Sequence, residues 1–244
     1  MASSMTTDPQ DELFDVLTPT GEPTGRVAPR GVVHRVGLWH AAFHLWIIWR
    51  DEDGTVVLLQ RRSRTKDTMP GRIDVSVGGH FRHGEYHRQY LRQGKAVTPI
   101  LREVHEELGL VACTTNVHWI GTRWSEHRET GKWDREIQEL FLWVLPAAPE
   151  MLWPDVQEVE QVVVVPLSSL AELLSGTVAG ISARILWDAS SGSTQGRETW
   201  ITLANLVPGR QAYWRAVVPQ LEAAAGGQLP SALVFRDDGP EETS

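Results

Sequence analysis

Three glutamates crowd onto one face of a short predicted helix. Glu103, Glu106 and Glu107 stand in the run REVHEELGL, and 3.6 residues per turn bring their side chains together. Like charges three or four residues apart weaken a helix, so some other interaction should favour them. Mg²⁺ is bound by a few carboxylates and keeps water or phosphate oxygens as further ligands. The cluster indicates either a metal site facing a phosphate or, as with most acidic clusters, a solvated helix face.

The helix that carries these glutamates has clear ends in the sequence. Thr98 can cap the free amides of the first turn, Pro99 suits the first turn, and Gly109 suits the end. Four apolar residues form a stripe for the core beside the acidic face: Ile100, Leu101, Val104 and Leu108. The sequence therefore predicts a helix over 98–108 that packs on a core and exposes its glutamates.

The surrounding segments alternate between strands and helices, as in an α/β domain. Aromatic and β-branched runs bounded by turn residues predict strands at 39–49, 55–61, 117–124, 136–145 and 161–166. Residues 125–135 are polar and are expected to form a loop between two of these strands. An N-terminal hairpin is expected over 12–27, and helices near 167–175 and 209–225.

Composition limits the kind of partner. The chain has 244 residues, a formal net charge of -8 and a pI near 5.6, which argues against a general nucleic-acid binder and favours a small molecule. Its one cysteine, Cys113, can form no internal disulfide. The first residues lack the pattern of a signal peptide, and no apolar run reaches membrane-spanning length. We therefore expect a cytoplasmic protein that does not bind a membrane.

The residues from Gly79 onward follow a known pattern. Five residues separate Gly79 from Glu85, and after a gap come R-E-V-x-E-E-x-G-L at 102–110. This resembles the Nudix box, G-x5-E-x7-R-E-U-x-E-E-x-G-U, where U is an aliphatic residue. Only the gap departs from it, because sixteen residues at 86–101 replace the usual seven. The sequence is thus similar to Nudix hydrolases with a nine-residue insertion in the box.

The resemblance implies a fold and an organisation of the chain. Nudix hydrolases have an α/β/α sandwich with a mixed β-sheet. We expect an N-terminal extension and hairpin at 1–34, a Nudix domain at 35–166, and a C-terminal helical extension with a loose tail at 167–244. Dimerisation is common in the family, so a homodimer is consistent with the resemblance.

The resemblance also implies a chemistry. Nudix hydrolases bind Mg²⁺ or Mn²⁺ through the box glutamates, and water attacks phosphorus in a diphosphate linkage. By position, Glu103 and Glu107 become the principal metal ligands, and Glu106 either supports them or shares a second ion. Glu85 and Arg102 become the pair that braces the box behind Gly79. Metals polarise phosphoryl oxygens and lower the pKa of bound water, which suits these residue types.

Two runs outside the box narrow the resemblance. LLQRRSRTKDTMPGRIDVSVGGH and GLWHAAFHLW are similar to isopentenyl-diphosphate isomerase and its hydrolase relatives. That likeness implies that Arg62 and Lys66 bind the substrate diphosphate. It also implies a metal site, whose residues by position are His40, His80, Asp134 and Glu136. Glu136 is the first candidate for a catalytic general base, and Glu126 and Glu139 are alternatives.

Three functions stay open from the sequence. The first is a metal-dependent hydrolase of a nucleoside diphosphate or triphosphate derivative or a similar organic pyrophosphate. The second is an isoprenoid-diphosphate isomerase, but the family's cysteine before the box glycine is replaced by Gly78. The third is an inactive Nudix-fold regulator, which has no need for an intact glutamate set. Because the insertion adds Arg88, Arg92 and Lys95, it predicts either a cationic lid over the substrate or a tolerated surface loop.

Overall fold

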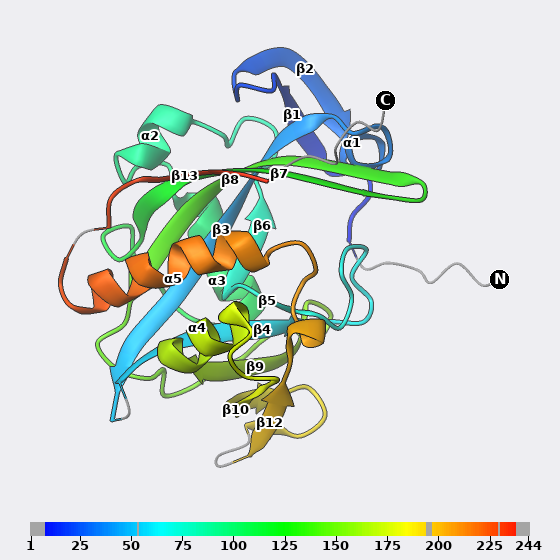
Figure 1. Ribbon diagram of the computed structural model, residues 1–244. Helices are drawn as coiled ribbons and strands as arrows, with labels where there is room; N and C mark the ends of the chain where they lie inside the picture. The colour runs from blue at the N-terminus through cyan, green and yellow to red at the C-terminus, as the bar shows by residue number, and fades with distance from the viewer. Residues whose placement is uncertain (1–7, 53, 194–196, 229, 238–244) are drawn as a thin grey trace.

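A large mixed β-sheet forms the centre of the molecule (Figure 1). The computed structural model describes residues 8–52, 54–193, 197–228 and 230–237. In this part of the chain the main path of the sheet runs β11-β10-β9-β4-β3-β8-β7-β13, with β5, β6 and β12 paired beside it. The β3–β8 and β7–β13 pairs are parallel and the other described pairs are antiparallel. This is the α/β class with a mixed sheet that the sequence predicts.

The elements have the following bounds. The strands are β1 (Leu13–Leu17), β2 (Pro23–Pro29), β3 (Trp39–Asp51), β4 (Gly54–Arg62), β5 (Ile73–Asp74), β6 (Val77–His80), β7 (His118–Glu129), β8 (Lys132–Val144), β9 (Val159–Pro166), β10 (Ile181–Asp188), β11 (Gly192–Ser193), β12 (Glu198–Ile201) and β13 (Leu233–Arg236). The helices are α1 (Arg30–Val36), α2 (Arg88–Arg92), α3 (Thr98–Leu108), α4 (Leu167–Ser175), α5 (Gln211–Ala225) and the 3₁₀ turn η1 (Leu203–Asn205).

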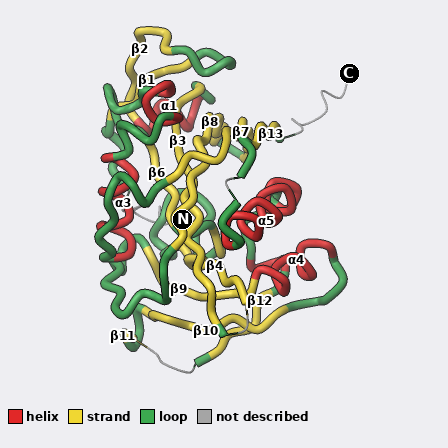
Figure 2. Tube along the Cα trace, turned by 90° about the vertical axis from the view of Figure 1, so that its left-hand side faces the viewer, coloured by secondary structure: helices red, strands yellow, loops and turns green. Residues whose placement is uncertain are grey.

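Helices cover both faces of the sheet, so the core has two layers (Figure 2). Successive residues of a strand point to opposite faces. On β3, Phe43 and Leu45 join the layer under α3, whereas Trp46 and Ile48 join the layer under α4 and α5. The sheet is therefore apolar on both sides, which explains why β3 reads as a continuous hydrophobic run.

The β3–β4 hairpin and the N-terminal β1–β2 hairpin confirm the predicted strands there. The predicted loop at 125–135 is wrong. Strands β7 and β8 continue through it and stay paired as far as Glu129 and Lys132, with Gly131 in the left-handed conformation at the turn. The segment is polar because this end of the hairpin projects beyond the core and lines a cavity.

Helix α3 begins and ends where the sequence predicts. Gly109 takes the left-handed conformation at its C-terminus, with φ of 69°. The capping role of Thr98 is wrong, because Thr98 is already helical and Val97 stands at the cap without a side-chain hydrogen bond. The apolar stripe of α3 lies in the core, and its glutamate face turns toward the cavity.

The segment after 167 contributes more than helices. Helices α4 and α5 match the two predicted there. In addition, β10 pairs with β9 and β13 pairs with β7, so the C-terminal segment extends the main sheet at both edges. The tail expected at the end of the chain lies, from 238 onward, outside the described residues. No helix in the described ranges is both long and apolar enough to span a membrane.

Candidate active site

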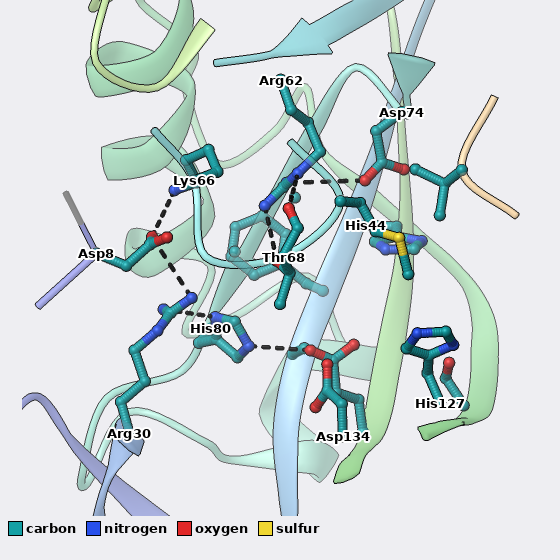
Figure 3. A pocket seen from close by; sticks show the side chains of 18 of the residues that line it. Asp8, Arg30, His44, Arg62, Lys66, Thr68, Asp74, His80, His127 and Asp134 are labelled. Carbon is teal, nitrogen blue, oxygen red and sulfur yellow. Dashed lines mark hydrogen bonds and ion pairs between the residues drawn. The ribbon is translucent and has the colours of Figure 1, made fainter. Parts of the chain in front are cut away.

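A cavity of about 350 Å³ opens where several elements end (Figure 3). Its wall is built by α3, β3, β6, the loop after β4, the β7–β8 hairpin, the N-terminal segment and the residues before α5. It brings together residues that are up to 229 positions apart, from Asp8 to Asp237. The residues singled out in the sequence that line it are Arg62, Lys66, Gly78, Gly79, His80, Glu103, Glu106, Glu107, Glu126, Asp134 and Glu136.

The three box glutamates differ in their surroundings. Glu107 is only 4% exposed, and Gln60 Nε2 donates a hydrogen bond of 2.9 Å to its Oε2. Glu106 is exposed, and Glu103 is half-buried beside Arg102. Burial, reinforced by the charge of Glu103, raises the pKa of Glu107 to about 8. Burial also raises the pKa of Glu103. A cation between these two carboxylates would stabilise their ionised forms and so offset the effect of burial on both pKa values.

Gly79 lets β6 approach the glutamates closely. A Cβ at Gly79 would lie 3.0 Å from Glu103 Cγ and 3.0 Å from the ring of Phe43. Behind it, Arg102 Nη1 donates to Glu85 Oε1 at 2.6 Å, and Arg102 Nη2 lies 3.2 Å from Glu103 Oε1. The arginine thus links Glu85 to the first carboxylate of the acidic face.

The two basic residues expected at the diphosphate already have protein partners. Arg62 donates through Nε and Nη2 to the carbonyl and hydroxyl oxygens of Thr68, each at 2.9 Å. The ammonium group of Lys66 lies 2.6 Å from Asp8 Oδ1 and also pairs with Glu158. Both side chains face the cavity. A substrate phosphate at Lys66 would therefore compete with two internal carboxylates for the ammonium group.

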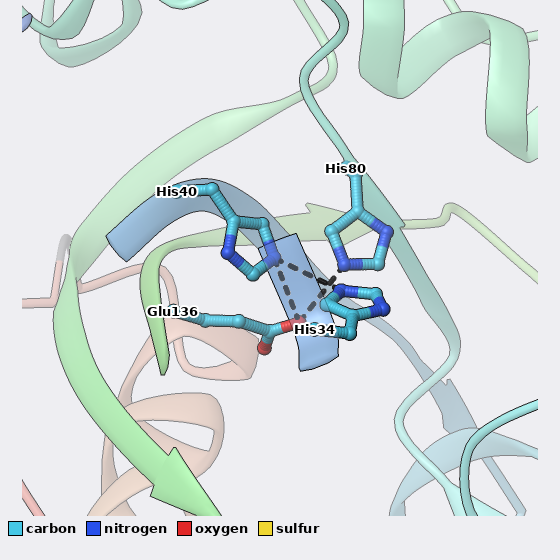
Figure 4. Close-up of side chains that lie close together, drawn as sticks. All are labelled: His34, His40, His80 and Glu136. Carbon is cyan, nitrogen blue, oxygen red and sulfur yellow. Dashed lines mark hydrogen bonds and ion pairs between the residues drawn. The ribbon is translucent and has the colours of Figure 1, made fainter. Parts of the chain in front are cut away.

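A second cluster gathers three histidines and a glutamate (Figure 4). One side-chain atom from each of His34, His40, His80 and Glu136 lies within 4.8 Å of the others. His80 Nε2 is 2.9 Å from Glu136 Oε1, and the Nε2 atoms of His34 and His40 are 3.2 Å apart. Asp134 Oδ1 lies 3.7 Å from His34 and 3.8 Å from His40. The structure thus brings together all four residues that the isomerase likeness implied, with His34 as an addition.

The sequence did not indicate His34 as a site residue, because its partners are distant in the sequence or lie across a turn. His34 sits on α1, and Gly37, with φ of 70°, reverses the chain so that His40, the second residue of β3, lies beside it. A Cβ at Gly37 would come within 2.5 Å of the Trp133 ring. The spacing of His34 and His40 carries no helical or strand periodicity, and only the motif HRVGLWH with its glycine turn could have signalled it.

The donor set of the cluster fits a divalent cation. Burial and the neighbouring histidines lower the pKa of His34, and burial and His80 lower that of His40 to about 4, so both rings are neutral at pH 7. His34 Nδ1 and Asp134 Oδ1 are buried without a hydrogen-bond partner. Burial and Glu136 raise the pKa of Asp134 well above its usual value. Neutral imidazoles beside an unsatisfied carboxylate suit a metal and are costly without one.

One alternative base and the insertion lie away from the cavity. Glu139 is fully buried and accepts hydrogen bonds from Tyr86, Trp119 and Thr122 on the sheet face opposite Glu136. Arg88 reaches the same carboxylate at 3.3 Å. Neither residue lines the cavity. The α2 segment therefore packs against β7 and β8 away from the cavity. This position does not support the hypothesis that the insertion forms a cationic lid over the substrate.

The family model of the NUDIX domain matches residues 39–186, more than half of the chain, and the chain belongs to this family. Nudix hydrolases act on nucleoside diphosphate derivatives and generally use divalent metals, and this chain is a pyrophosphohydrolase by class.

Three known proteins illustrate the similarity. An uncharacterized Nudix hydrolase from Clostridium acetobutylicum is 27% identical over 212 residues, which cover 87% of this chain and 98% of that protein. Nudix hydrolase 3 of Arabidopsis thaliana is 43% identical over 100 residues, 41% of this chain but only 12% of that protein. The solved structure of a NUDIX hydrolase from Alicyclobacillus acidocaldarius has a TM-score of 0.48 and 14% identity, covering 78% of this chain and 96% of that one.

Proposed function

We propose that this protein is a divalent-metal-dependent hydrolase that cleaves the diphosphate linkage of a nucleoside diphosphate or triphosphate derivative or a similar organic pyrophosphate. The observation that carries the proposal is that one cavity is lined by Glu103, Glu106 and Glu107, by the cations Arg62 and Lys66, and by His80 and Glu136. Carboxylates for a metal and cations for phosphate thus face the same small volume.

Two sets of residues would hold cations. Glu103 and Glu107, supported by Glu106, would hold Mg²⁺ or Mn²⁺ against the diphosphate. A second set would hold another divalent ion: His34, His40, His80, Asp134 and Glu136. Bound divalent ions supply charge stabilisation at phosphoryl oxygens and lower the pKa of a coordinated water.

The other residues of the site hold reacting groups in position and balance their charges. Lys66, in competition with Asp8, and Arg62, fixed by Thr68, bind phosphoryl oxygens of the diphosphate. Arg102 orients Glu103 through its link to Glu85. Glu136 accepts from His80, and although burial opposes it, His80 and His40 keep the pKa of Glu136 well below its usual value. An ionised Glu136 at this place can accept a proton from the attacking water.

Isomerase activity is the second candidate, because the histidine cluster is the feature that resembles the isomerase branch. Gly78 opposes it, since no thiol stands where that branch has its cysteine. A regulator without turnover is the third. The intact carboxylate set favours hydrolysis over both.

The test is a metal-dependent cleavage assay. Purified protein with Mg²⁺ or Mn²⁺ is incubated with nucleoside di- and triphosphates, dinucleoside polyphosphates, nucleotide sugars, coenzyme A and isopentenyl diphosphate, and products are identified by mass spectrometry. Cleavage by the wild type that Glu107→Gln abolishes supports the proposal. Binding without cleavage of any compound would favour the regulator, and isomerised isopentenyl diphosphate would favour the isomerase.

A further inference from the structure

His44 has a cavity-facing edge and a buried edge. It lies on β3, on the same sheet face as His40, and is only 4% exposed, yet it lines the cavity (Figure 3). Its Nδ1 atom lies 3.2 Å from the hydroxyl of Tyr213, which comes from α5. That hydroxyl also accepts a hydrogen bond of 3.1 Å from Trp46 Nε1. Through Tyr213, helix α5 thus fixes the Nδ1 side of the His44 ring.

The chain of donors determines which nitrogen of His44 carries the proton. Indole Nε1 can only donate, so the oxygen of Tyr213 accepts from Trp46. The single hydroxyl proton of Tyr213 is then available for His44, which among the described residues is its one other hydrogen-bond partner. A protonated Nδ1 would leave this buried hydroxyl proton without an acceptor among the described residues, so Nδ1 accepts and the neutral ring carries its proton on Nε2.

The side of the ring away from Nδ1 lies beside Gly78, which also lines the cavity. Gly78 is the cross-strand partner of His44, and a Cβ there would lie 3.6 Å from Cδ2, the ring atom next to Nε2. Because Gly78 has no side chain, the space beside this edge stays open. No described residue forms a hydrogen bond with Nε2. Burial, together with Arg210, lowers the pKa of His44 well below its usual value, so the ring stays neutral.

We propose that His44 is a substrate-binding residue that donates a hydrogen bond from Nε2 to an oxygen of the substrate's diphosphate, and that Tyr213 is the positioning residue that fixes this tautomer. The inference rests on the proposed function for the diphosphate. It gives α5 a role in the site: the helix holds the donor in one orientation. A neutral imidazole suits this role because it keeps its proton while it polarises the acceptor.

The test replaces His44 by glutamine and by asparagine, whose side-chain amides have the same polarity but reach different distances. The side-chain amide of His44→Gln reaches the place of Nε2, whereas that of His44→Asn reaches only the place of Nδ1. The probe is methylenediphosphonate with Mg²⁺, a diphosphate that cannot be hydrolysed, and its binding is measured by titration calorimetry. We expect His44→Gln to bind within about threefold of wild type and His44→Asn to bind about tenfold or more weakly, as for loss of a hydrogen bond to a charged group. Melting temperatures of both variants show whether they fold.

A spectroscopic readout tests the tautomer without any substrate. The ¹⁵N signals of His44, assigned by their loss in His44→Gln, should show a protonated Nε2 and an unprotonated Nδ1. In Tyr213→Phe both tautomers of His44 should be populated, and diphosphonate binding should be weakened less than in His44→Asn. A protonated Nδ1 in wild type, or equal binding by the Gln and Asn variants, would overturn the inference.

These outcomes separate the inference from the function on which it rests. If wild-type protein cleaves a substrate of the panel and the two His44 variants behave alike, the role of His44 fails and the hydrolase stands. If the wild type cleaves nothing and does not bind the diphosphonate, the proposed function fails, whatever the tautomer of His44.

Discussion

The carboxylate of Asp8 lies 2.6 Å from the ammonium group of Lys66. Its other oxygen accepts from the backbone amide of Asp67 at 2.8 Å, and Arg30 Nη2 stands 3.5 Å away. Burial opposes ionisation, but Arg30 and Lys66 lower the pKa of Asp8, so it is charged at pH 7. An ammonium, a guanidinium and a backbone amide around one anion are also the surroundings that bind a phosphate.

We therefore expect Asp8 to compete with the substrate for Lys66. Asp8→Asn should lower KM about threefold or more, because a neutral amide holds the ammonium group less tightly. It should also lower the melting temperature, since Lys66 and Arg30 lose a buried counter-charge. Steady-state kinetics and thermal unfolding measure both effects. Asp11→Asn, at an exposed neighbouring position, is the matched control. A raised KM would show instead that Asp8 organises the cations for substrate.

Metal binding should depend on pH through Glu107. Its pKa of about 8 means that, before metal binds, the carboxyl holds a proton at neutral pH. A cation must displace that proton, so the apparent affinity for Mn²⁺ should rise with pH up to about 8, by as much as tenfold per unit. Mn²⁺ titrations at several pH values measure this slope. Glu107→Gln should bind Mn²⁺ more weakly and with a smaller dependence on pH. An unchanged slope in this variant would show that the displaced proton does not come from Glu107.

The same carboxyl affects stability with a definite sign. The folded protein holds a proton on Glu107 between the unfolded pKa of 4.5 and the folded value of about 8, whereas the unfolded chain releases it. In metal-free protein this group therefore makes the free energy of unfolding fall as pH rises through that window. Saturating Mg²⁺ should abolish the trend, because it binds the ionised form, so that neither the folded nor the unfolded state holds this proton. Thermal unfolding at pH 5.5 and 8.5, with and without Mg²⁺, checks both statements.

Two adjacent glycines should respond differently to a methyl group. A Cβ at Gly79 would press on Glu103 Cγ and the Phe43 ring at 3.0 Å, whereas one at Gly78 would make ordinary contacts of 3.6 Å or more. Gly79→Ala should therefore cost about 1–3 kcal/mol of stability, as overpacking does, and displace Glu103. Gly78→Ala should fold with nearly the wild-type melting temperature. Thermal unfolding distinguishes them, and equal losses would contradict the contact geometry.

The sequence predicted what depends on local spacing. The helix of Glu103 to Glu107, its end at Gly109 and the β3–β4 hairpin follow from periodicity and turn residues, because those signals act within a few residues. The continuation of β7 and β8 through 125–135 was missed because polar residues of this segment line a cavity and do not face a core.

What the sequence could not give is the set of contacts made over long distances. His34 reaches its cluster through a glycine turn, and Tyr213 reaches His44 from 169 residues away. Asp8 and Lys66 are likewise 58 residues apart. None of these pairs shares a helix or strand period, so only the folded chain brings them together.

Finally, the box insertion should affect stability and not substrate choice. Arg88 Nε lies 3.3 Å from the buried carboxylate of Glu139, and Arg88 Nη1 donates to the carbonyl of Thr20 at 2.9 Å. Arg88→Met should lower the free energy of unfolding by about 1–3 kcal/mol, because it removes a partner of a buried charge that keeps its other hydrogen bonds. Lys95→Met makes the same charge change at an exposed position and should cost little. Both variants should keep the wild-type kcat/KM across the substrate panel, since neither residue lines the cavity. A shift in substrate preference for Arg88→Met alone would show that the insertion reaches the substrate after all.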